Sequence, residues 1–233
     1  MWYNGGMDEE VSNILVAAEE LKRPLTTLRQ MALSFDGLDV KNEELRGKMV
    51  LVSDRAIRQV NDLMKIGKLE NRLFEMEPVA VRGVCDEVTR ELTNLFQFNR
   101  RDLFIRYSNR ARLAWANYEL LKSVVYNFLL NAVYYTGDGV RSELVVKDFH
   151  DKVRVGVRDF GPALPMDVWR EMKRGWVEKP TSIAMRPGSS GLGLYIASRF
   201  SRYMGASVGA VRHRDGTSFY VELPMSRQAR LFE

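Results

Sequence analysis

A seven-residue repeat of apolar residues is the feature that most constrains how this chain folds. It begins at Val11 and continues through four successive heptads without a polar residue in either seam. One seam contains Val11, Ala18, Leu25 and Ala32, and the other contains Ile14, Leu21, Leu28 and Phe35. Such a repeat predicts a long amphipathic helix that must bury its apolar stripe against another helix. The stretch 36–39, Asp-Gly-Leu-Asp, ends the repeat with residues typical of a turn.

A second helical pattern follows this turn. Its apolar residues, spaced by three and four, are Leu45, Met49, Val52, Ala56, Val60 and Leu63. Two such helices joined by a short connection predict an antiparallel hairpin over residues 8–72. One hairpin has too little interior to stand alone, so we expect a homodimer that forms a four-helix bundle. The alternative is that the hairpin packs on the C-terminal half of its own chain.

The periodicity changes at Pro78, and residues 76–226 form a second predicted domain. Short β-branched or alternating runs predict strands at 103–107, 144–149, 153–157 and 219–223. Helical patterns lie between them at 82–98, 117–135 and 191–204. Helices and a mixed sheet of this size predict an α/β sandwich, which with the helical hairpin makes the fold class α+β.

Composition excludes several classes of protein. The net charge of +5 is spread along the chain and is not concentrated with exposed aromatic residues, so we expect no nucleic-acid partner. Cys85 is the single cysteine, which excludes an internal disulfide and fits a reducing compartment. No apolar run reaches the roughly 18 residues that span a bilayer. We therefore expect either a cytoplasmic protein or the soluble part of a membrane-bound sensor.

Three short motifs in the second domain have chemistry suited to a nucleotide. Asn127 and Asn131 lie four residues apart on one face of a predicted helix and offer amide oxygens to a hard cation. Asp159 and Gly161 follow a predicted strand, where a carboxylate can accept from an exocyclic amine. The small-residue loop 188–193 leads into a helix and presents free N–H groups to phosphate. Each motif alone has an ordinary reading: solvated helix residues, a common turn or a flexible linker.

Taken together, these motifs resemble the cytoplasmic core of a sensor histidine kinase, from about residue 11 to residue 224. The stretch NFLLNAVYYT is similar to the N box of that family, DFGPALP to its first glycine box and GSSGLGLYIASRF to its second. The stretch GTSFYVELP resembles the closing strand of its ATP-binding domain. The resemblance implies a dimerisation and phosphoacceptor hairpin followed by a Bergerat-type ATP-binding domain.

The resemblance also implies a role for each matching residue. Asn131 would ligate Mg²⁺, Asn127 would help to position metal or phosphate, and Asp159 would recognise adenine. The cofactors would be ATP or ADP with Mg²⁺, and residues 169–187 would form a lid over the nucleotide. Gly161 would border the adenine pocket, and the phosphate-side loop would include Gly188, Gly191, Leu192 and Gly193.

The hairpin departs from the family where the reaction should occur. The acceptor segment of the family reads His-Glu-Leu-Arg-Thr-Pro-Leu, whereas this chain has Glu19 at the histidine position and Glu20 directly after it. A carboxylate cannot replace the imidazole nitrogen that forms the phosphoramidate. Arg23 stands where the family often has Thr or Asn, and we expect an exposed ion pair between Glu19 and Arg23.

The nucleotide motifs depart less. Tyr134 replaces the usual basic residue of the N box, which removes one phosphate contact. Ala163 replaces the second glycine of the first glycine box and adds a methyl group near the base or ribose.

We therefore expect a dimeric pseudokinase of a two-component pathway. It would bind ATP or ADP, fail to autophosphorylate, and dock a response regulator receiver domain or another kinase. Two alternatives remain open from the sequence. The first is an active kinase that phosphorylates a histidine in trans, and the second is a structural dimerisation module with a dead nucleotide site.

Overall fold

The computed structural model describes residues 20–31, 40–69, 73–108, 113–137, 139–149, 151–166, 169–170 and 192–226. Its first described helix covers residues 20–31. The remaining elements are α2 (Val40–Leu69), β1 (Glu77–Ala80), α3 (Val81–Phe98), β2 (Asp102–Tyr107), β3 (Leu113–Ala116), α4 (Tyr118–Tyr135), β4 (Arg141–Phe149), β5 (Lys152–Asp159), α6 (Leu192–Tyr203), β6 (Ser207–His213) and β7 (Gly216–Pro224).

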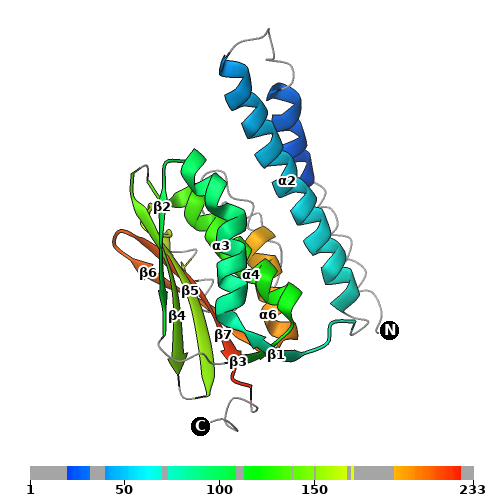
Figure 1. The fold of residues 1–233 in the computed structure, drawn as a ribbon, viewed down its shortest axis with the longest axis vertical. Helices are drawn as coiled ribbons and strands as arrows, with labels where there is room; N and C mark the ends of the chain where they lie inside the picture. The colour runs from blue at the N-terminus through cyan, green and yellow to red at the C-terminus, as the bar shows by residue number, and fades with distance from the viewer. Residues whose placement is uncertain are drawn as a thin grey trace.

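The second domain is built on a five-stranded mixed sheet with the strand order β2-β4-β5-β7-β6. β2 is parallel to β4, and the other neighbours are antiparallel. Buried and less buried residues alternate along β5 and β7, so valine, phenylalanine and leucine side chains project from one face of the sheet. Helices α3, α4 and α6 cover that face (Figure 1), which confirms the predicted sandwich of helices on a mixed sheet.

Helix α4 is the central element of the domain. Asn117 caps its start, because the side-chain oxygen accepts from the backbone N–H of Leu120. Twelve of its 18 residues are buried, since the helix packs on the sheet, on α3 and on α6 at once. A helix enclosed in this way has no broad solvent face. The polar residues Ser123 and Asn127 are therefore buried with the apolar ones.

The long helix α2 belongs to the predicted hairpin and lies against the second domain. In Figure 1, α4 and α6 stand between the sheet and α2. In the same view the helix over residues 20–31 overlaps the first half of α2, which accords with a hairpin, and the connection at 32–39 lies outside the described residues.

Besides Leu63, which belongs to the pattern predicted from periodicity, helix α2 has apolar residues outside that pattern. Leu51, Leu63 and Ile66 pack against the core of the second domain. Val50, Ile57 and Met64, seven residues apart, are more than half exposed. Among the described helices, none is long and apolar enough to cross a membrane.

Candidate functional site

The two motifs that the family resemblance assigns to phosphate and metal come together between α4 and α6. A Cβ atom placed on Gly193, in the first turn of α6, would lie 2.8 Å from Oδ1 of Asn127. The absence of a side chain at Gly193 allows the two helices this approach, which brings the start of α6 to the Asn127 side chain. The amide nitrogen of Asn127 donates to the backbone carbonyl of Ser123 at 2.9 Å. The amide is thereby oriented, with its oxygen toward Gly193.

Asp159 lies at the end of β5 and is 1% exposed. Its Oδ1 accepts from the backbone N–H of Thr217 at 3.1 Å and from that of Gly161 at 3.2 Å. Two backbone donors on one oxygen fix the position of the carboxyl group. Gly216 makes this approach feasible, since its φ of +139° suits glycine and a Cβ there would meet the carbonyl oxygen of Asp159 at 2.0 Å.

The loop after Asp159 contacts the end of α4, the helix that carries Asn127 and Asn131. A Cβ atom on Gly161 would lie 1.7 Å from the carbonyl oxygen of Tyr135. Thr136 follows α4, and its hydroxyl pairs with that of Ser142 at 2.8 Å. The Thr136 hydroxyl also accepts from the backbone N–H of Phe160 at 3.4 Å. This bond and the close approach of Gly161 to Tyr135 connect the Asp159 loop to the helix that carries Asn127 and Asn131.

The predicted site residues occupy different surroundings in the described structure. Asn131 lies one turn beyond Asn127 on α4 and is partly exposed. Ala163 is half-buried beside the fully buried Leu164, and Leu192 is fully buried at the start of α6. Gly188, Gly191 and residues 171–187 of the predicted lid lie outside the described residues.

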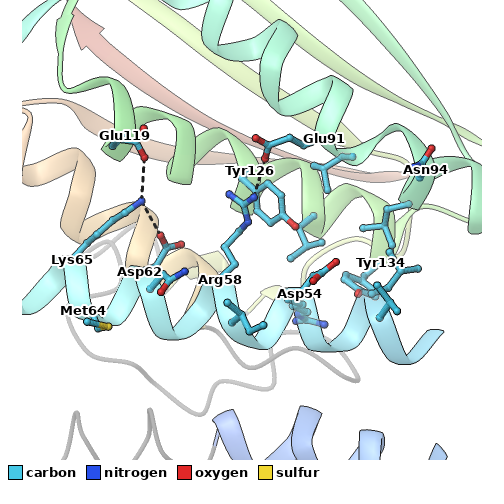
Figure 2. A pocket seen from close by; sticks show the side chains of 18 of the residues that line it. Asp54, Arg58, Asp62, Met64, Lys65, Glu91, Asn94, Glu119, Tyr126 and Tyr134 are labelled. Atoms are coloured by element: carbon cyan, nitrogen blue, oxygen red, sulfur yellow. Dashed lines mark hydrogen bonds and ion pairs between the residues drawn. The ribbon is translucent and has the colours of Figure 1, made fainter. Parts of the chain in front are cut away.

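Tyr134 faces the hairpin. The guanidinium carbon of Arg55 on α2 lies 4.6 Å from the centre of the Tyr134 ring. Tyr134 also lines a cleft of about 860 Å³ between α2 and helices α3 and α4. Figure 2 shows this cleft with Tyr134 near one end and Lys65 near the other. In the described structure the Tyr134 ring thus contacts α2. This contact is separate from those of Asn127, Gly193, Asp159 and Gly161 described above.

Several polar residues that sequence reasoning did not single out connect α2 to the second domain. Arg58 pairs with Glu91 of α3 at 2.8 Å, and its guanidinium lies 3.8 Å from the centre of the Tyr126 ring. Asp62 is 2% exposed and accepts from the hydroxyl of Ser123 at 2.8 Å. Burial raises the pKa of the Asp62 carboxyl, against the hydrogen bond from Ser123 and the nearby charge of Lys65.

On the hairpin, Glu19 lies outside the described residues, and so does its expected ion pair with Arg23. Glu20 is 6% exposed. An oxygen of Glu20 lies 3.9 Å from the Arg23 guanidinium, whose side chain is largely exposed, so this contact contributes little stability.

The residues present fit a nucleotide with a hard cation. Two glycines leave room where a methyl group would collide, one beside Asn127 and one beside Tyr135. A buried carboxyl and two asparagine side chains supply oxygen ligands and amine acceptors in the same region. The described residues contain no cluster of three His, Cys, Asp or Glu side chains suited to a metal. Any cation here would therefore rely on amide oxygens, water and the phosphates themselves.

Comparison with known proteins defines the class of the second domain. Residues 116–227 match the profile of the family described as "Histidine kinase-, DNA gyrase B-, and HSP90-like ATPase". This segment is similar to the ATP-binding domains of that family, and the Bergerat-type fold expected from its motifs is confirmed.

The curated relatives of the whole chain are sensor histidine kinases. The chain is 24% identical to hybrid signal transduction histidine kinase K of Dictyostelium discoideum over 89% of its own length and 19% of the relative. It is 25% identical to the adaptive-response sensory kinase SasA of a Synechocystis strain, over 92% of its own length and 59% of the relative. The chain thus spans only part of the length of the relatives it matches.

Solved structures share the fold at low sequence identity. Histidine kinase ThkA, solved in complex with response regulator protein TrrA, aligns with a TM-score of 0.64 at 20% identity and covers 96% of this chain and 62% of ThkA. Full-length ShkA in complex with AMPPNP aligns with a TM-score of 0.61 at 21% identity, over 94% of this chain and 46% of ShkA. The chain therefore shares its fold with these histidine kinase structures.

Proposed function

We propose that this chain is a nucleotide-binding signalling module of the histidine kinase type that does not phosphorylate itself. It binds ATP or ADP with Mg²⁺ in the second domain and acts as a dimeric pseudokinase in a two-component pathway. Its partner is a receiver domain or another kinase, and it works in the cytoplasm. The observation that carries this proposal is a contrast: Asn127 contacts Gly193 and Asp159 is held by backbone donors, while a glutamate stands at the acceptor position.

The geometry of the second domain supports nucleotide binding. Asp159 is held by two backbone donors, so its acceptor position is set before a base arrives. Gly193 sits against Asn127 at the start of α6, where free N–H groups of a helix favour phosphate oxygens. In this arrangement Asp159 accepts from the adenine amine, Asn131 ligates Mg²⁺, and Asn127 positions the phosphates. The AMPPNP complex of the similar kinase ShkA supports an adenine nucleotide as the ligand.

The acceptor chemistry supports the loss of autokinase activity. A neutral histidine ring supplies the nitrogen that attacks the γ-phosphoryl group, and Glu19 has only carboxylate oxygens. Glu19 instead gives the hairpin a permanent negative charge where a kinase carries its phosphohistidine. The complex of ThkA with its response regulator supports a receiver domain as the partner.

The exposed stripe on α2 supports the dimer. Val50, Ile57 and Met64 are 54%, 59% and 57% exposed and recur every seven residues. An apolar heptad stripe in water is the pattern by which helices join into bundles. A second copy of the hairpin would cover it.

Thermal unfolding with ATP or ADP, each with and without Mg²⁺, tests the nucleotide claim. A ligand that binds only the folded state at 100 times its Kd stabilises it by about 2.7 kcal/mol. We expect a clear Mg²⁺-dependent rise in melting temperature. The absence of any rise at millimolar nucleotide would instead indicate a structural dimerisation module.

A second candidate function, phosphoryl transfer in trans, is favoured by the same assembled site. Labelled ATP incubated with this chain and a histidine-bearing hairpin separates the two candidates. Label on the partner hairpin that depends on this chain would end the pseudokinase assignment.

A further inference from the structure

One buried carboxyl group of helix α2, that of Asp62, contacts the helix that carries Asn127. Asp62 projects from α2 into the second domain, where its Oδ1 accepts from the Ser123 hydroxyl at 2.8 Å. Lys65 donates to the same hydroxyl oxygen at 3.1 Å. Its Nζ also lies 3.6 Å from Oδ1 of Asp62, as Figure 2 shows. Asp62 and Ser123 are both 2% exposed, so this joint between the two parts is shielded from water.

Ser123 is also hydrogen-bonded to Asn127. Its backbone carbonyl accepts the Asn127 amide at 2.9 Å, one helical turn further along α4. The Asn127 side chain is also among the hydrogen-bonding groups around the Asp62 carboxyl. Asn127 in turn touches Gly193 at the start of α6. A continuous series of contacts therefore leads from α2 to the residues that hold phosphate and metal.

The carboxylate of Asp62 would repel an anionic ligand bound at Asn127. Lys65 is the nearest cation to Asp62, and it is shared with Glu119 of α4, also at 3.6 Å (Figure 2). Arg58, on the same helix, is engaged by Glu91 at 2.8 Å. A Mg²⁺-nucleotide retains net negative charge, and at Asn127 it would place that charge beside a buried carboxylate. Two like charges in a region shielded from water repel strongly.

We propose that Asp62 is a positioning residue that couples the docking of α2 to the nucleotide site with opposite sign. When α2 is docked through Asp62 and Ser123, the affinity for Mg²⁺-nucleotide is low. When nucleotide binds, docking of α2 weakens by the same factor, because coupling between two binding events is reciprocal. This inference rests on the proposed nucleotide binding and adds its regulation by the hairpin.

The affinity of three variants for a fluorescent ADP analogue with Mg²⁺ tests the coupling. Asp62→Asn keeps the shape of the side chain and removes its charge. Ser123→Ala leaves the charge and removes the hydroxyl that ties α2 to α4. Asp54→Asn is the matched control, since Asp54 is exposed on the same helix and lines the same cleft. We expect Asp62→Asn and Ser123→Ala to bind the analogue at least about fivefold more tightly than wild type, and Asp54→Asn to match it.

Hydrogen exchange of the α2 amides gives a second measurement. A purely structural role of Asp62 would not make this exchange depend on nucleotide. In the wild-type chain, exchange at residues 58–66 accelerates when Mg²⁺-ADP is added, and in Asp62→Asn this dependence on nucleotide is lost. Equal affinity of wild type and Asp62→Asn, with unchanged exchange, would overturn the coupling and leave nucleotide binding intact. Failure of every variant to bind the analogue would overturn both the coupling and the proposed function.

Discussion

Substitutions of Asp159 can separate its contribution to stability from its contribution to nucleotide binding. Its Oδ1 accepts two backbone N–H groups, from Thr217 and Gly161, at 3.1 and 3.2 Å. Asp159→Ala leaves both donors without this acceptor. Each unsatisfied group costs about 1–3 kcal/mol, so unfolding becomes easier by about 2–6 kcal/mol. Asp159→Asn keeps a carbonyl oxygen at the same place, and we expect a change within about 1 kcal/mol.

We expect Asp159→Asn to weaken nucleotide binding strongly, because the two backbone N–H groups fix which side-chain atom faces the base. With its carbonyl oxygen facing the two N–H groups, the Asn amide nitrogen takes the place of the second carboxylate oxygen. It then presents a donor to the amino group of adenine, which is itself a donor. Loss of a hydrogen bond to a charged group costs about 1.5–3 kcal/mol, or about 10- to 150-fold in affinity.

Urea denaturation and titration with a fluorescent ADP analogue measure the two effects in the same samples. We expect Asp159→Asn to unfold like wild type and to bind nucleotide weakly. Wild-type affinity in Asp159→Asn would refute contact between this carboxyl and the base. An equal loss of stability in the Asn and Ala variants would refute its assignment as the acceptor of both N–H groups.

Three further predictions concern the loop, the hairpin and the bundle. Gly161→Ala places a methyl group against the Tyr135 carbonyl and should lower the free energy of unfolding by about 1–3 kcal/mol in chemical denaturation, whereas Gly156→Ala, with its nearest neighbour 3.7 Å away, should be nearly neutral. Because burial raises the pKa of Asp62 in the folded state, the folded chain retains this proton when the unfolded chain has lost it. Stability contributed by this group is therefore lost as pH rises from the ordinary pKa of 3.8 through the raised pKa. Asp62→Asn does not titrate, so its free energy of unfolding should rise relative to that of wild type over that interval. Ile57→Glu should shift the sedimentation coefficient from dimer to monomer, and an unchanged dimer would remove the exposed stripe on α2 from the interface.

The elements with strong local signals were predicted closely. The predicted helices at 82–98, 117–135 and 191–204 correspond to α3, α4 and α6. Each has an apolar pattern long enough to fix both its type and its limits. The strands missed by the sequence analysis were β1 and β3, of four residues each, and β6. β1 and β3 are too short for an alternating pattern to stand out, and β6 contains a glycine that the Tyr220 ring covers.

Within the candidate site, sequence identified the residues but not all of their neighbours. Asn127 and Gly193 are 66 positions apart, and only the folded chain shows that one must be glycine because of the other. Asp62 escaped attention because periodicity treats a charged residue in an amphipathic helix as solvent-facing. Asp62 is buried where it accepts a hydrogen bond from Ser123, a residue of helix α4 that is distant in the sequence. The contact of Tyr134 with Arg55 could not be predicted for the same reason, since it requires α2 to dock on α4.

Transfer of label from γ-labelled ATP tests most directly whether Glu19 alone prevents autophosphorylation in a chain with a working nucleotide site. The measurement compares the wild-type chain with Glu19→His in the presence of Mg²⁺. We expect no label on the wild type, and acid-labile label on Glu19→His, because the variant restores the attacking nitrogen opposite an intact ATP-binding domain. Label on the wild-type chain, or none on a folded, nucleotide-binding Glu19→His variant, would contradict this explanation of the lost activity.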